Sequence, residues 1–203
     1  MGDTIYRMAY DRTNDRGFFA GGVRSASKNN SMSSLIDGTS NTIAISERVS
    51  APTLSSNSMK GFYIRLTATD ADAKKDSCLA SQSTSEPGFY NTSLGTTTNI
   101  VGYLFQEGRS GNVYFNTVIA PNGPSCGYLD TVGIFTVTSN HRGGVNAALA
   151  DGSVRFISDT IDTGSSTYDG STDASDPHTK QGPSPFGVWG ALGSINGGES
   201  TAL

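Results

Sequence analysis

The sequence predicts an α+β domain dominated by antiparallel strands, and three observations support this prediction. Hydrophobic residues make up only 35% of the 203 residues and charged residues 16%, while glycine, Ser, Thr and Asn are abundant. Short runs alternate between apolar and polar residues, as half-buried strands do. At least two of these runs are joined by a turn containing Asp-Gly. The length allows one domain spanning residues 1–203 with a sizeable core.

Several elements are predicted before the first cysteine. A short helical turn is expected at residues 33–36, ahead of Asp37-Gly38. Residues 42–49 read as a strand with Ile43 and Ile45 on one face. Residues 61–67 alternate well and predict a second strand.

The rest of the chain alternates strands with polar insertions. Residues 68–98 are rich in Ser, Thr and Asp and predict a long loop around Cys78. Strands are expected at residues 99–105, 113–119 and 133–138. Residues 159–185 form a second polar insertion, after which the apolar segment around Trp189 is expected to dock on the sheet.

The stretch HRGGVNAALADGSVRFI, residues 141–157, predicts a β-hairpin. Apolar and polar residues alternate on both sides of Asp151-Gly152, which we expect to form a two-residue turn of type I′. That turn requires positive φ at both central residues, which Asp tolerates and Gly adopts freely. Gly143 and Gly144 give similar freedom after His141.

The spacing from His141 to Asp151-Gly152, with Gly143, Gly144 and Asn146 between them, resembles the C-terminal signature of the bacterial H-X9-DG pseudopilin-like proteins. Three other segments resemble the same family in the family's order, and together the four span roughly residues 16 to 199. They are DGTSNTIA (37–44) followed by Ser46-Glu47, FNTVIAPNGPSC (115–126), and GVWGALG (187–193) followed by Gly197-Gly198-Glu199. The resemblance implies a pilin-like globular head with several hairpins and long polar loops.

The N-terminal part differs from that family. Its members usually begin with a prepilin leader and a hydrophobic helix, but residues 1–30 contain no apolar run long enough for a membrane helix or a secretory h-region. The chain is therefore either a portion of a longer pseudopilin-like protein or a leaderless member. The resemblance implies an extracellular or cell-envelope location.

An exported protein favours a disulfide between Cys78 and Cys126, and the alternative is two unrelated buried thiols. The absence of a CxxC pair excludes a zinc ribbon or a thioredoxin-like motif. The net charge of −4 and the scattered basic residues make nucleic acid and an anionic membrane surface unexpected partners.

His141 has a structural, a catalytic and a metal-binding interpretation. We expect a structural one, in which the imidazole bonds backbone or the Asp151 carboxylate across the base of the hairpin. A triad can be written from Ser139 or Ser153, His141 and Asp151, but no G-x-S-x-G elbow accompanies it. We therefore expect no enzyme activity.

Two binding alternatives remain open. Five aspartates in the second polar insertion are candidate calcium ligands, although the EF-hand order is absent: Asp159, Asp162, Asp169, Asp173 and Asp176. The aromatic residues offer a platform for carbohydrate if they are exposed, whereas burial in strands is their default: Tyr6, Tyr10, Phe18, Phe19, Tyr63, Tyr103, Phe105, Tyr114, Phe115 and Trp189.

We therefore expect a structural or interaction domain of an envelope-associated or extracellular assembly, with other protein subunits as partners and no required cofactor. The alternative is an extracellular carbohydrate- or calcium-binding β module.

Overall fold

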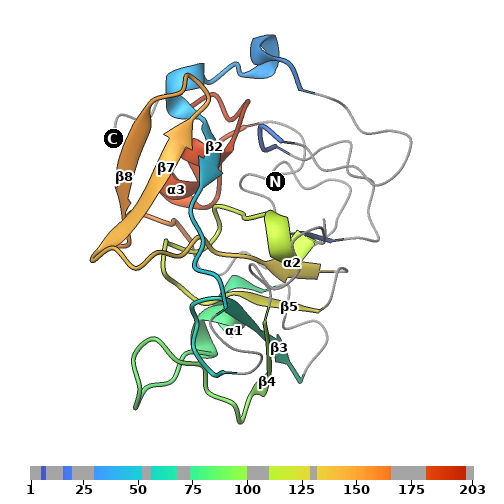
Figure 1. Cartoon of the computed structure of the whole chain (residues 1–203). Helices are drawn as coiled ribbons and strands as arrows, with labels where there is room; N and C mark the ends of the chain where they lie inside the picture. Colours follow the sequence, from blue (N-terminus) through green and yellow to red (C-terminus); the bar gives the residue numbers. More distant parts are fainter. Residues whose placement is uncertain are drawn as a thin grey trace.

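The computed structural model describes residues 6–7, 16–19, 30–51, 56–67, 74–99, 110–128, 132–165 and 182–199. These residues form two β-sheets joined by short helices and irregular segments (Figure 1). The five-stranded sheet has the order β1-β6-β5-β3-β4: β1 (Tyr6–Arg7), β6 (Val132–Ile134), β5 (Cys126–Tyr128), β3 (Phe62–Leu66) and β4 (Gly95–Asn99). The three-stranded sheet has the order β2-β7-β8: β2 (Ile43–Ser46), β7 (Gly144–Leu149) and β8 (Val154–Ser158).

Adjacent strands pair antiparallel except β3 and β5, which are parallel. The helices are short, as the composition predicts: α1 (Lys75–Ala80), α2 (Ser110–Val113), α3 (Gly187–Gly193) and the 3-10 turns η2 (Met32–Ser34) and η3 (Thr39–Asn41). The predicted α+β fold class with antiparallel strands dominating is thus confirmed. The helical turn predicted before Asp37-Gly38 corresponds to η2.

Helix α3 covers the inner face of the three-stranded sheet (Figure 1). Trp189 and Leu192 are fully buried and pack in one core cluster with Ile43, Val145 and Leu149. The closing apolar segment therefore docks on a sheet as predicted. Its helical form was not predicted because three of its seven residues are glycine, which disfavours helix.

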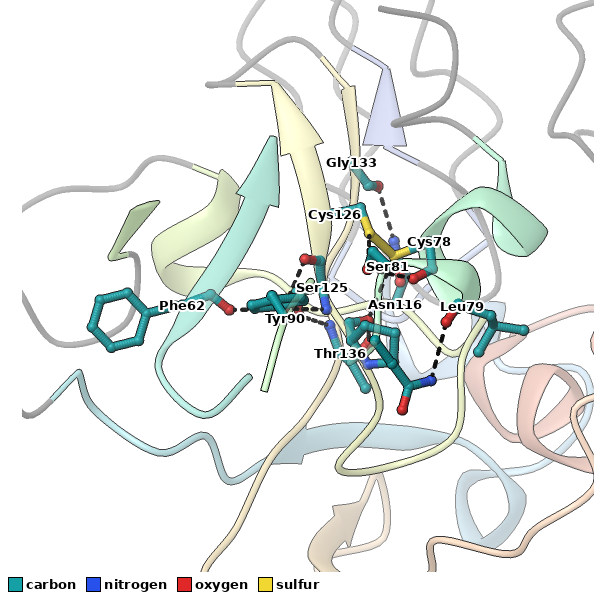
Figure 2. The surroundings of a disulfide bond; sticks show 12 residues. Phe62, Cys78, Leu79, Ser81, Tyr90, Asn116, Ser125, Cys126, Gly133 and Thr136 are labelled. Carbon is teal, nitrogen blue, oxygen red and sulfur yellow. Dashed lines mark hydrogen bonds between the residues drawn. A yellow bond between two sulfur atoms is a disulfide. The ribbon is translucent and has the colours of Figure 1, made fainter. Parts of the chain in front are cut away.

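A second core lies on the five-stranded sheet and includes the disulfide. Phe62, Ile64 and Ile134 are buried there beside the Cys78–Cys126 bond, which links α1 to β5. The predicted disulfide is confirmed. Figure 2 shows Tyr90 between Phe62 and Ser125, the residue before Cys126, and its hydroxyl lies 2.9 Å from the carbonyl oxygen of Ser125 and 3.2 Å from that of Phe62.

The loop predicted at residues 68–98 is confirmed for residues 81–94, which form turns and bends, and is wrong where α1 and β4 occur. The polar residues of β4 have little intrinsic preference for a strand, but they form one because they pair with β3, from Phe62↔Asn99 to Leu66↔Gly95. Of the strand predicted at residues 99–105, only Asn99 is among the described residues, and it is the last residue of β4. Residues 61–67 do contain the predicted strand, β3.

The strand predicted at residues 113–119 is also wrong. The segment follows α2 as an irregular chain in which residues 116–119 are all buried, so its apolar residues do not alternate between two faces. The buried Asn116 fixes it by donating from its backbone nitrogen to Phe135 O at 2.9 Å and from Nδ2 to Gly133 O at 3.3 Å. Of residues 133–138, only the first two belong to a strand, β6.

The prediction that Ile43 and Ile45 share a face of β2 is wrong. The register of β2 against β7 shifts between them, so that Ile43 pairs with Leu149 and Ile45 with Ala148. This bulge turns Ile45 to the opposite face. Ile43 is consequently 4% exposed and Ile45 61% exposed.

Candidate functional site

The β7–β8 hairpin is the centre on which the motif segments converge. Its strands pair from Gly144↔Ser158 to Ala148↔Val154, which confirms the predicted hairpin. Gly144 lets the backbones of β7 and β8 come close together, since a Cβ at this position would collide with the carbonyl oxygen of Ile157. The side chains of Val145 and Ile157 point into the core.

The hairpin turn differs from the predicted type I′. Gly152 has φ of +86°, but Asp151 has no positive φ, and the loop contains three residues, 150–152. The backbone nitrogen of Gly152 donates to Leu149 O at 3.0 Å, and that of Leu149 donates to Ser153 O at 2.8 Å. This is the pattern of a type I turn followed by a left-handed glycine.

Asp151 stabilises this turn with its side chain. Its Oδ1 accepts from the backbone nitrogen of Ser153 at 2.8 Å and from Ser153 Oγ at 2.7 Å. Hydrogen bonds from the side chain and backbone of Ser153, and from the side chain of Ser40, lower the pKa of Asp151 to about 2. The backbone nitrogen of Asp151 also donates to Thr39 O at 3.1 Å, which joins the turn to η3 of the DGTSNT segment.

His141 contacts Glu47 and not Asp151, contrary to the prediction. Its Nε2 lies 3.6 Å from Glu47 Oε2, and its ring packs edge-on against Phe156. Asp151 sits at the other end of the hairpin, about five residue pairs or roughly 17 Å away along the strands. His141 is therefore a surface residue at the open end of the hairpin, with 57% of its side chain exposed.

Glu47 joins the first motif segment to the hairpin. Its Oε1 accepts a 2.6 Å hydrogen bond from the backbone nitrogen of Asn146 and a 3.3 Å bond from Asn146 Nδ2. Ser46 Oγ donates to Asn146 O at 2.9 Å. The Ser46-Glu47 pair thus fixes Asn146, and the motif residues of two segments form one network.

The second motif segment bonds the same hairpin, and the last segment packs on it through Trp189 and bonds the other two segments. Asn122 donates from Nδ2 to Gly144 O at 3.3 Å, and its Oδ1 accepts from the backbone nitrogen of Ser139 at 2.8 Å. Trp189 Nε1 donates to Ile119 O at 2.9 Å. Asp37 accepts from the backbone nitrogens of Gly197 at 2.6 Å and Gly198 at 2.8 Å, which ties the first segment to the last.

The serine, histidine and aspartate of the candidate triad are not assembled. Ser139 Oγ lies 2.7 Å from Gly144 O, to which it donates, and accepts from the backbone nitrogen of His141 at 3.0 Å. Ser153 bonds Asp151 at the far end of the hairpin from His141. The hydroxyl of Ser139 therefore fixes the backbone at the start of β7, and Ser153 and Asp151 fix the hairpin turn.

Two of the calcium candidates, Asp159 and Asp162, lie in the described residues; Asp169, Asp173 and Asp176 lie outside them. Next to Asp162, the buried Lys75 ammonium donates to Thr163 O at 2.5 Å and lies 3.4 Å from Ser165 O. The carbonyl oxygens of Thr163 and Ser165, which are ligands of the kind that calcium takes, thus lie against the Lys75 ammonium. Within the described ranges, no three His, Cys, Asp or Glu side chains gather as a metal site would require.

Of the aromatic residues considered for carbohydrate, Tyr63 and Trp189 are buried. Phe18 and Phe19 are in contact, but their rings are tilted by 52°, so they do not form a flat platform. The side chains of Tyr6, Tyr10, Tyr103 and Phe105 are not among the described residues.

The outer face of the three-stranded sheet carries exposed apolar side chains beside Asn146, which the sequence reasoning missed. Ile45, Ala148 and Val154 pair across β2, β7 and β8, so their side chains form one row on one face. Phe156, two residues from Val154, shares that face. Val154 is 67% exposed and Phe156 53%. We call Ile45, Ala148, Val154 and Phe156 the outer sheet face.

One family model matches the chain over residues 3–164, and the family is described as "Protein of unknown function (DUF1559)". The match includes the DGTSNT, NTVIAPN and H-X9-DG segments and ends before the GVWGALG segment. No curated protein and no solved structure matches the chain. In the part of the chain that the structure describes, no helix has both the length and the apolar character needed to cross a membrane.

Proposed function

We propose that this chain, which belongs to the DUF1559 family, is a non-enzymatic structural and interaction domain of a pseudopilin-like protein in an envelope-associated or extracellular assembly. The observation that carries the proposal is the outer sheet face. Three large apolar side chains are exposed there, Ile45, Val154 and Phe156, on a sheet whose opposite face is fully packed. Contiguous exposed apolar residues mark surfaces that another protein covers.

The motif residues support this function because hydrogen bonds within the fold engage them. Glu47, Asp37 and Asn122 each bond backbone groups of another motif segment. Their arrangement builds a rigid sheet, and Glu47, which lies 3.6 Å from His141, uses its other carboxylate oxygen to accept from the backbone nitrogen of Asn146. A rigid scaffold presenting an apolar face is suited to binding a neighbouring subunit.

The disulfide supports an extracellular or envelope location. Disulfides form and persist in oxidising compartments, and this one joins two buried sulfurs in the core of the five-stranded sheet. The partners we propose are other protein subunits, including further copies of this chain.

Sedimentation velocity of the oxidised protein, from micromolar to near-millimolar concentration, tests the proposal. We expect concentration-dependent association that is lost when Val154→Ser and Phe156→Ser are combined. The matched control is Ile36→Ser, because Ile36 is 70% exposed and lies outside the sheets. A protein that stays monomeric throughout, or a double variant that associates like wild type, would count against the outer sheet face as an interface.

Melting of the same sample with calcium, with EDTA and with a panel of small glycans tests the alternative. A ligand that binds only the folded state raises the melting midpoint by mass action. We expect no shift. A calcium- or glycan-dependent rise would favour a binding module instead.

A further inference from the structure

A groove runs beside β2, next to the outer sheet face, and its volume is about 400 Å³. Its walls come from β2, α2 and residues 18–19, and exposed apolar side chains contribute to them: Phe19, Ile45 and Val113. Ligand sites commonly have volumes of roughly 300–1,000 Å³, so this groove fits a short segment.

The groove follows the free edge of β2. All four residues of the strand line it, Ile43 through Ser46. Ile43 and Ile45 face opposite sides of the sheet because of the bulge between them, so a groove that both residues line lies along the strand's edge. Among the described strands, β2 pairs only with β7, which leaves its other edge open at the groove. An open edge presents backbone donors and acceptors to an added strand.

One charged side chain, Arg48, lines the groove. Its Nη1 donates to Gly111 O at 2.8 Å and to Tyr114 O at 3.0 Å, while its buried Nε has no hydrogen-bond partner in the described structure. Burial lowers the pKa of Arg48 to about 10. The guanidinium thus bonds neutral carbonyl groups, and its Nε is a charge-assisted donor that an anion in the groove would satisfy.

We propose that this groove binds an extended apolar segment of a partner protein, which adds as a strand to the edge of β2 and places a carboxylate on Arg48. This inference rests on the proposed function and specifies its partner. The net charge of the chain is −4, so attraction for an acidic segment is local to Arg48. A fatty acid would also offer an apolar chain and a carboxylate, but it cannot satisfy the backbone groups of the β2 edge.

Calorimetric titration of the full oxidised chain tests this inference. The probe is a seven-residue peptide of alternating valine and threonine with a free C-terminal carboxylate, compared with the same peptide amidated and with decanoate. We expect the carboxylate peptide to bind at least about tenfold more tightly than the amide, the size of one charge-assisted hydrogen bond. Equal affinity for both peptides, decanoate binding as tightly as the peptide, or no peptide binding at millimolar concentration would each overturn the proposal.

Variants locate the binding. Arg48→Met should abolish the preference for the carboxylate, and Val113→Asp, on an exposed wall of the groove, should weaken the peptide about tenfold or more. Val113→Asp keeps the test decisive if Arg48→Met does not fold. Ile36→Asp is the control, because Ile36 is 70% exposed, lies outside both sheets and does not line the groove. If Val113→Asp binds like wild type, the groove is not the site.

The titration and the sedimentation experiment fail independently. If the outer-face variant loses self-association but no peptide binds, the proposal for the groove is rejected and the proposed function stands. If the peptide binds but the outer-face variant self-associates like wild type, the groove stands as a binding site and the outer sheet face is rejected as an interface.

Discussion

Replacing Glu47 by alanine should destabilise the protein, because it removes the side chain that links the first motif segment to the hairpin. The carboxylate accepts two bonds from Asn146, at 2.6 and 3.3 Å, and lies 3.6 Å from His141. A hydrogen bond to a charged group contributes about 1.5–3 kcal/mol. The exposed contact with His141 contributes at most about 1 kcal/mol.

Glu47 is about one-third exposed, so water replaces part of what is lost, and the lower end of the range applies. We expect Glu47→Ala to reduce the free energy of unfolding by about 2 kcal/mol, which corresponds to a decrease in melting temperature of roughly 4–8 °C for a chain of this size. Glu47→Gln keeps an acceptor oxygen without the charge and should cost about half as much.

Urea unfolding followed by circular dichroism measures these differences. Glu86→Ala is the matched control, because Glu86 is exposed outside the motif segments, and it should lie within about 0.5 kcal/mol of wild type. His141→Ala should cost less than about 1 kcal/mol. If Glu47→Ala unfolds like Glu86→Ala, or His141→Ala costs more than Glu47→Ala, the assignment of Glu47 as the link between the two segments is refuted.

Three further outcomes are expected. Replacing Cys78 and Cys126 together by serine opens a 48-residue separation and should lower the free energy of unfolding by about 4 kcal/mol on the chain-entropy account, so an unchanged urea midpoint would contradict it. Gly152→Val should cost about 1–3 kcal/mol, because φ there is +86°, and Gly152→Asn should recover much of this since Asn tolerates that region; equal melting of Val and wild type would disprove the turn. Hydrogen bonds from Ser153 lower the pKa of Asp151 to about 2, so the carboxylate contributes stability above its unfolded pKa of about 4 and loses it as pH falls toward 2. Asp151→Asn should therefore be less stable than wild type at neutral pH and converge with it in urea titrations near pH 2, whereas a constant difference would rule this out.

The hairpin was predictable because its two strands and its turn are neighbours in the sequence, so the residues that determine it lie in one short stretch. Alternation fixes which residues of β7 and β8 face the core, and the Asp-Gly pair positions the turn. The type of turn was missed, since a type I turn with a left-handed glycine and a type I′ turn both place Gly at its last position. The disulfide was predictable for a different reason, because two cysteines allow a single intramolecular pair.

The partner of His141 was not predictable from local pattern. Glu47 lies 99 residues before Asn146, and nothing in its surroundings distinguishes it from a solvated charge on a strand. Its place in the family's first motif segment was the one available signal. The same limit explains α1 and β4, since a polar stretch becomes ordered there through the disulfide and the ladder with β3.

The wrong prediction for Ile45 is the most informative error. Without the bulge, Ile43 and Ile45 would both be buried, as alternation requires, and β2 would present the small residues Ala44 and Ser46 outward. With the bulge, Ile45 moves from the core to the surface at a cost in buried apolar area, and it joins both the outer sheet face and the groove beside β2. Bulges near sheet edges redirect side chains in this way, and departures from local pattern concentrate where a protein binds something. The exposure of Ile45, an apolar residue that alternation would bury, therefore supports the proposal that a partner protein covers this edge of the sheet.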